Sequence, residues 1–86
     1  SAQGKALQAY LATFPRRPEK ELSEHFHEGT ELIYVLSGCL AVRYQGEEHE
    51  LRAGDSLHMD AVEPHGYRGV SEDDAKAIVV TLPPRL

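Results

Sequence analysis

Residues 25–38 read HFHEGTELIYVLSG, and this stretch decides the fold that we expect for the rest of the chain. Its histidines, His25 and His27, stand at positions i and i+2, which lie on the same face of a β-strand about 6.5–7 Å apart. Both rings could therefore reach one metal ion. Glu31 has the same parity as the histidines, and a strand bent at Gly29 would turn its carboxylate toward the same point.

A third imidazole is available from His65, which lies in the segment EPHGY at residues 63–67. Three imidazoles and one carboxylate suit Fe, Mn, Ni, Co or Zn, and an octahedral arrangement leaves two positions open for water or a ligand. An isolated His-x-His pair is more often a half-exposed strand pair, and five histidines in 86 residues make a chance pair quite possible. The metal site is favoured by its surroundings, because Glu31 has matching parity and a second turn, Gly54-Asp55, follows one hairpin later.

Two motifs spaced along the chain resemble those of the cupin superfamily. Residues 25–38 read His-x-His-x3-Glu-x6-Gly, which resembles the first cupin motif, and residues 54–65, GDSLHMDAVEPH, resemble the second. The resemblance covers about residues 20–82, nearly the whole chain. It implies an all-β fold, the cupin double-stranded β-helix or antiparallel jelly-roll barrel, holding one divalent transition metal (Zn, Fe, Mn or Ni). The implied metal ligands are His25, His27, Glu31 and His65.

The closer resemblance is to the C-terminal cupin domain of bacterial transcription regulators that carry an XRE-type helix-turn-helix. It rests on ELIYVLSG at residues 31–38, GDSLHMD at 54–60 and PHGYR at 64–68. It implies a metal-binding sensor of a small-molecule effector, whose binding shifts an attached DNA-binding module between states. We expect Tyr67 and Met59 to contact that ligand.

Two other hypotheses are compatible with the same residues. One is a small mononuclear metalloenzyme of the cupin type, a dioxygenase or an isomerase, in which the open metal positions hold substrate. An enzyme also needs a general acid or base, and Tyr67 and His58 are the only nearby candidates, so we predict no catalytic residue and expect His58 to face solvent. The other is a metal-free cupin that binds a small molecule without catalysis. A helix-turn-helix upstream in the full-length reading frame would favour the sensor over the enzyme.

Charge and composition narrow the classes of partner. A net charge of −5 and an isoelectric point near 5.4 argue against direct contact with nucleic acid, which requires a cluster of Lys and Arg. DNA contact would belong to a missing helix-turn-helix domain. No apolar run approaches the roughly 18 residues of a membrane span, nothing resembles a secretion signal, and the single cysteine, Cys39, fits a reducing compartment. We therefore expect a cytoplasmic location without membrane association.

The length of 86 residues leaves room for a single cupin domain, residues 1–86. The chain begins SAQG without an initiator methionine, so we expect residues 1–6 to be a tag remnant or linker on a piece of a longer protein. Residues 7–14 could form a helix, but their aromatic and β-branched residues favour a strand. Residues 19–24 are predicted to lead as a strand into the histidines, and residues 75–82 to form the last strand.

Residues 32–36 are continuously apolar, which predicts a strand buried on both faces. Ile33 and Val35 would continue the Glu31 side into the barrel, and the residues between them would point outward. The N-terminal segment, around residues 10–14, or a partner chain must cover this outward stripe. Because so small a core is stabilised by sharing surface, we expect a homodimer. The outward residues are Leu32, Tyr34 and Leu36.

Overall fold

Seven β-strands and one turn of 3-10 helix make up residues 6–83, the part of the chain that the computed structural model describes. Residues 1–5, most of the predicted tag remnant or linker, lie outside the described residues. Within residues 6–83, no helix has the length and apolar character needed to cross a membrane. The elements are β1 (Gln8–Phe14), η1 (Glu19–Glu21), β2 (Thr30–Ser37), β3 (Cys39–Tyr44), β4 (Glu47–Arg52), β5 (Ser56–Asp60), β6 (His65–Gly69) and β7 (Ala75–Leu82).

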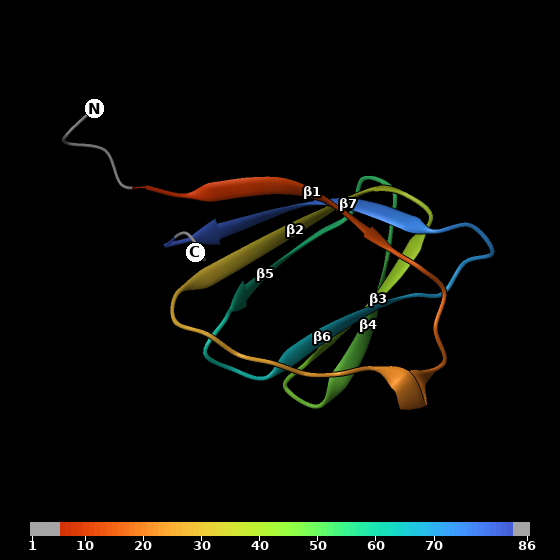
Figure 1. Ribbon diagram of the computed structural model, residues 1–86, viewed down its shortest axis with the longest axis horizontal. Coiled ribbons are helices and arrows are strands. Elements are labelled where there is room, and N and C mark those ends of the chain that lie inside the picture. The colour runs from red at the N-terminus through yellow and green to blue at the C-terminus, as the bar shows by residue number, and fades with distance from the viewer. Residues whose placement is uncertain (1–5, 84–86) are drawn as a thin grey trace.

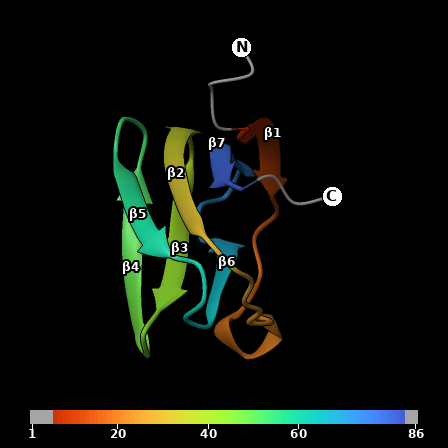
Figure 2. The ribbon, with the colours of Figure 1, turned by 90° about the vertical axis from the view of Figure 1, so that its left-hand side faces the viewer.

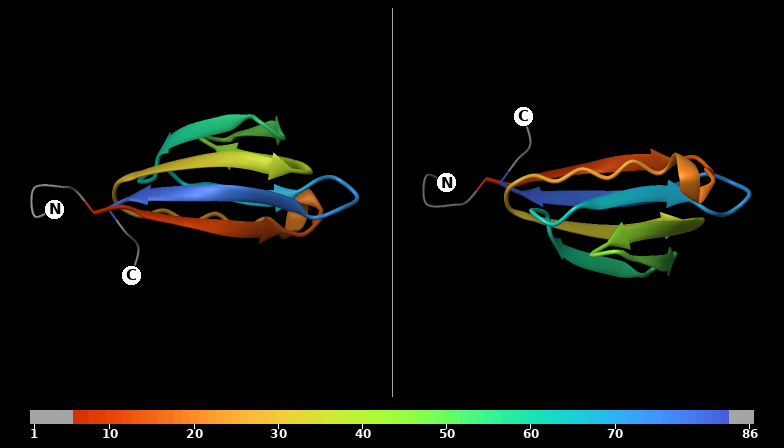
Figure 3. Two further views of the ribbon diagram at one scale, coloured as in Figure 1. Left: turned by 90° about the horizontal axis from the view of Figure 1, so that it is seen from above. Right: turned by 90° about the horizontal axis from the view of Figure 1, so that it is seen from below.

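The strands form two antiparallel sheets. One has the order β1-β7-β2-β5, and its four strands lie side by side in Figure 3; the other has the order β4-β3-β6. Figure 1 shows the segment between β1 and β2 passing beside β6. Figure 2 shows β4 and β5 on one side of the molecule, and β1 with η1 on the other. This arrangement confirms the predicted all-β jelly-roll fold.

Alternation along the strands separates a buried core from an exposed outer face. On β2, Ile33 and Val35 are fully buried, whereas Leu32, Tyr34 and Leu36 are exposed, as predicted. Each large aliphatic side chain buried in this way stabilises the fold by about 1.5–3 kcal/mol. The rest of the core comes from both sheets and consists of Leu40, Val42, Leu51, Met59, Ala75, Ala77 and Val79.

The part of the chain that precedes β2, which includes β1 and η1, differs from the prediction in two ways. Residues 19–24 do not form a strand, because their charged side chains have no apolar face to bury and the chain instead makes the turn η1 after Pro18. The N-terminal strand does not cover the outward side chains of β2, because β1 pairs with β7 at the edge of the same sheet. Its Leu11 therefore lies beside Ile78 and extends the exposed apolar face.

Gly29 makes the turn that leads the chain into β2. Its φ angle is +98°, a backbone conformation that favours glycine, and a side chain there would overlap the backbone carbonyl of Leu82. The carbonyl of Gly29 accepts a hydrogen bond from the backbone N–H of Ala61, at 2.9 Å. The turn thus ties the loop before β6 to the start of β2.

Candidate metal centre

Three side chains from separate parts of the chain converge on one point: His27 from the segment before β2, Glu31 from β2, and His65 from the first position of β6. Backbone hydrogen bonds hold these parts together. The N–H of His27 donates to the carbonyl of Ala61 at 2.9 Å, and His25 and His65 exchange two backbone hydrogen bonds of 3.0 Å each. The histidines are therefore positioned by loop-to-strand pairing, and not by the two-residue repeat of a regular strand.

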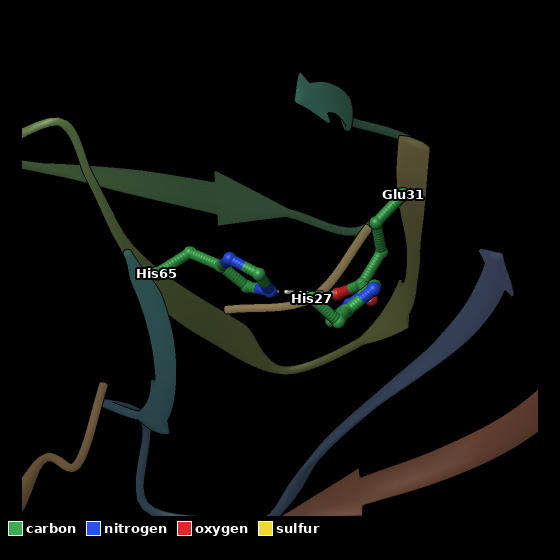
Figure 4. A group of neighbouring side chains, drawn as sticks. All are labelled: His27, Glu31 and His65. Atoms are coloured by element: carbon green, nitrogen blue, oxygen red, sulfur yellow. Dashed lines mark hydrogen bonds and ion pairs between the residues drawn. The ribbon is translucent and has the colours of Figure 1, made fainter. Parts of the chain in front are cut away.

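The potential ligand atoms of His27, Glu31 and His65 all lie within 4.8 Å of one another, and Figure 4 shows the three side chains pointing toward a common centre. His27 Nε2 is 3.1 Å from Glu31 Oε1, and His65 Nε2 is 3.7 Å from Glu31 Oε2. The Glu31 residue is only 4% exposed and His65 is fully buried. A carboxylate buried to this degree requires a nearby positive charge or several hydrogen-bond donors.

The hydrogen bonds of the two imidazoles decide what their other nitrogens can do. His27 Nδ1 lies 3.0 Å from the carbonyl oxygen of Glu28, and His65 Nδ1 lies 2.8 Å from that of Glu63. A carbonyl oxygen only accepts, so each Nδ1 carries the proton and donates it. In the neutral rings both Nε2 lone pairs then face the carboxylate of Glu31. Metal-ligating histidines commonly donate their second nitrogen to a carbonyl in this way.

His65 Nε2 gives the sharpest test of whether a metal fits this site. Among residues 6–83 this buried nitrogen has no hydrogen-bond partner, and an unpaired buried polar atom is costly. Two lone pairs and a carboxylate directed at one point repel one another unless a cation lies between them. Imidazole nitrogen and carboxylate oxygen are ligands that Zn, Fe, Mn and Ni accept. The residues present therefore fit a divalent transition metal.

His25, the fourth predicted metal ligand, lies beside this group and is not part of it. It is exposed, its ring centroid is 5.4 Å from that of His65, and its nitrogens lie outside the 4.8 Å cluster. Its contribution to metal binding stays a prediction.

Tyr67, predicted to contact a ligand, points into the site and donates a hydrogen bond from its hydroxyl to Glu31 Oε2. Burial, followed by this hydrogen bond to Glu31, raises the pKa of Tyr67 well above its ordinary value, so the hydroxyl keeps its proton and acts as a donor. The other predicted ligand contact, Met59, is 1% exposed and belongs to the hydrophobic core. It lies opposite Glu31 in the β2–β5 pairing but does not line the adjoining cavity, so its ligand contact stays a prediction. His58 is exposed on β5, as we expected.

A cavity of about 320 Å³ adjoins the centre. One wall, the inward face of β1, was not predicted from the sequence, although the alternation of Tyr10, Ala12 and Phe14 carries that signal. The segment after β1 was also given no role. The lining residues are Tyr10, Ala12, Phe14, Arg17, Glu21, Ser23, His25, Glu31, Tyr67 and Val79.

Comparison with known proteins relates the chain to larger proteins. It is 31% identical over 74 residues to a protein named polyketide synthase CurC from Streptomyces cyaneus, covering 85% of this chain and 48% of that protein. It is 41% identical over 46 residues to quercetin 2,3-dioxygenase of Bacillus subtilis strain 168, covering 52% of this chain and 14% of the dioxygenase. The chain thus spans about half the length of the first relative and a small part of the second.

A solved structure gives the corresponding comparison of folds. KdgF from Halomonas sp. superimposes with a TM-score of 0.80 at 26% identity, covering 95% of this chain and 74% of that one. The family model described as "Cupin domain" matches residues 14–81, which include His27, Glu31 and His65. Most of β1, which forms one wall of the cavity, precedes the match. The sequence match, the two-sheet fold and the histidine–carboxylate centre agree, and the chain belongs to the cupin family.

Proposed function

We propose that this cupin domain binds one divalent transition metal together with a small-molecule effector, and that it is the sensor domain of a bacterial transcription regulator. The observation that carries the proposal is the convergence of His27, Glu31 and His65 beside an open cavity. Three protein ligands leave positions on a metal that a small molecule can occupy. The bound metal would supply a Lewis acid to which a polar group of the effector attaches.

The residues around the centre are suited to hold the metal and to orient a ligand. His27, Glu31 and His65 would bind the metal, with His25 as a fourth ligand from the edge of the cavity. Tyr67 restrains the carboxylate of Glu31 through its hydroxyl, which keeps one carboxylate oxygen occupied and the other facing His27. The cavity is at the small end of ligand pockets, which measure about 300–1,000 Å³, so we expect a small effector.

The regulatory part of the proposal rests on the resemblance of residues 31–38, 54–60 and 64–68 to the cupin domains of helix-turn-helix regulators. DNA would be contacted by such a domain elsewhere in a longer protein, and not by this acidic domain itself. Effector binding would shift the equilibrium between DNA-binding states by no more than the difference in the effector's affinity for those states.

We also propose a homodimer, formed through the outer face of the sheet β1-β7-β2-β5. Leu11, Ile78 and Tyr34 are neighbours across three strands and are 64%, 38% and 44% exposed, so they form part of one apolar face. A second copy is the occupant that we expect, because regulators of this kind read two-fold operators as dimers. Leu32, Leu36 and Val80 extend the same face.

An enzymatic role, as a dioxygenase or an isomerase, is the second candidate. It is favoured by the named relatives, a polyketide synthase protein and quercetin 2,3-dioxygenase, and by the protonated Tyr67 hydroxyl beside the centre. Glu21 and His25 also line the cavity and could transfer a proton.

Metal and ligand binding can be tested in one series of experiments. Elemental analysis after reconstitution with Zn, Fe, Mn and Ni in turn should give one metal per chain, and His27→Ala and His65→Ala should abolish it without loss of β-sheet circular dichroism. His58→Ala removes an exposed histidine from β5 and should keep the metal. A thermal-shift screen of the loaded protein should then find a stabilising small molecule. Absence of stoichiometric metal in the wild type would overturn the proposal, and metal-dependent turnover of a stabilising compound would favour the enzyme.

A further inference from the structure

The inward face of β1 forms an aromatic and apolar wall of the cavity. Tyr10, Ala12 and Phe14 face inward on β1, so a small side chain stands between two aromatic rings. Val79 is the cross-strand partner of Tyr10 and continues this surface. The ring of Phe14 also lies 5.3 Å from that of Tyr67, at an angle of 51°, so aromatic surface reaches the metal centre. Such a surface favours a planar ring, because aromatic groups pack well in tilted and offset pairs.

Arg17 brings a positive charge to the same cavity. Its backbone is fixed from both sides, since its N–H donates to the carbonyl of Gly69 at 3.1 Å and Arg68 Nη1 donates to its carbonyl at 2.9 Å. Its guanidinium, by contrast, makes no ion pair or hydrogen bond within residues 6–83. Arg68 is instead paired with Glu48 through two hydrogen bonds. An unpaired guanidinium on a residue that lines a cavity is suited to a carboxylate, which it can bind through two parallel hydrogen bonds.

The acidic residues of the lining limit the charge that a ligand can carry. Glu31 already accepts a hydrogen bond from the hydroxyl of Tyr67 and belongs to the metal cluster. Glu21 lies in η1 and also faces the cavity, where it disfavours a second negative charge near Arg17. The electrostatics therefore suit a ligand with one carboxylate and an otherwise uncharged body.

From this arrangement we infer that the cavity selects a small aromatic monocarboxylate. Its carboxylate binds Arg17, and its ring lies over Ala12 between Tyr10 and Phe14. The volume of about 320 Å³ is large enough to hold a single ring with its carboxylate. This inference rests on the proposed function, because it names the chemical class of the effector that binds beside the metal.

The test compares three probes that separate charge from shape. Benzoate, its neutral analogue benzamide, and acetate, which lacks the ring, are titrated into Zn²⁺-loaded, ¹⁵N-labelled protein, and affinities are read from amide chemical shifts by NMR. We expect benzoate to bind at least about tenfold more tightly than either other probe, as one charge-assisted interaction allows. The shifts should be largest at residues 10–17 and 67.

Two variants then ask whether Arg17 is the carboxylate partner. Arg17→Met keeps the aliphatic stem and removes the charge, and it should reduce the preference for benzoate over benzamide to about twofold or less. Arg16→Met is the matched control, because Arg16 is also exposed but does not line the cavity, and it should leave the preference unchanged. The ¹⁵N spectrum of each variant shows whether that variant is folded. The comparison of benzoate with benzamide in the wild-type protein does not depend on either variant.

The outcomes distinguish this inference from the proposed function. A preference for benzoate that survives in Arg17→Met would place the carboxylate on the metal and overturn the inference, as would equal binding of acetate and benzoate. Failure of all three probes, with a different compound found by the thermal-shift screen, would overturn the inference and leave the sensor proposal standing. Loss of stoichiometric Zn²⁺ binding would overturn the proposed function itself.

Discussion

Replacing Gly29 by alanine tests whether the turn into β2 supports both the fold and the metal centre. Gly29 and Gly54 have nearly the same φ angles, +98° and +92°, so alanine incurs similar backbone strain at both, about 1–2 kcal/mol. At Gly54 the added methyl group meets nothing within 4 Å, whereas at Gly29 it overlaps the backbone carbonyl of Leu82. Moving packed backbone adds about 1–3 kcal/mol. We therefore expect the free energy of unfolding to fall by about 2–5 kcal/mol in Gly29→Ala and by about 1–2 kcal/mol in Gly54→Ala.

Urea unfolding of the metal-free proteins, followed by far-UV circular dichroism at one fixed protein concentration, measures this difference. Calorimetric titration with Zn²⁺ then compares the folded variants. Gly29 lies between His27 and Glu31, so Gly29→Ala should also weaken metal binding, whereas Gly54→Ala should not. Equal destabilisation by the two substitutions would refute the argument, because it would mean that strain alone sets the cost and that the Leu82 carbonyl yields freely.

Four further predictions follow from the same contacts. Tyr67→Phe removes the hydroxyl that donates to Glu31 and should destabilise the metal-free protein by about 1–3 kcal/mol. The Zn²⁺-loaded protein should lose less stability, because the cation then neutralises the carboxylate. Equal losses of unfolding free energy in urea would contradict this prediction. The hydrogen bond from Arg68 lowers the pKa of Glu48 below its ordinary 4.5, so the pair stabilises the fold above that pH and this contribution is lost as the pH falls through the lowered pKa. Urea unfolding should accordingly show a difference of up to about 1 kcal/mol between wild type and Glu48→Gln at pH 7 that disappears in acid. If the proposed homodimer forms through the outer face of β2, Tyr34→Glu should yield a monomer or an aggregate in light scattering. A wild type that is monomeric at micromolar concentration would disprove the proposed dimer. Metal affinity should fall below about pH 6, where protons compete for the imidazoles, and an affinity independent of pH would argue against histidine ligands.

The alternation of apolar residues made β2 predictable, because burial of one face fixes which side chains point inward. The predicted strand at residues 19–24 was wrong, because Leu22 is the single apolar residue of this segment and Pro18 precedes a turn. His25 and His27 look equivalent in the sequence, yet only His27 enters the cluster, because residues 22–29 do not form a regular strand. That difference depends on pairing between distant segments, which no local pattern encodes.

The wall formed by β1 was missed for a related reason. The apolar positions of residues 10–14 predict a strand, but not which sheet it joins or what its inward face meets. Pairing of Tyr10 with Val79 decides that β1 borders the metal centre, and the two residues are far apart in the sequence. Met59 was predicted to contact the ligand because of its place in the second motif. It pairs with Glu31 across the sheet, but its side chain is buried in the hydrophobic core.

Glu31 belongs to the sheet β1-β7-β2-β5, whereas His65 belongs to β4-β3-β6. A metal bound to both would be a cross-link between the two layers, joining residues 34 positions apart in the chain through bonds stronger than packing. Separation of the layers would then require release of the metal, so the metal would both raise the equilibrium stability of the fold and slow its unfolding. A domain with a small core could in this way resist proteolysis in the cell for longer than its equilibrium stability alone would allow.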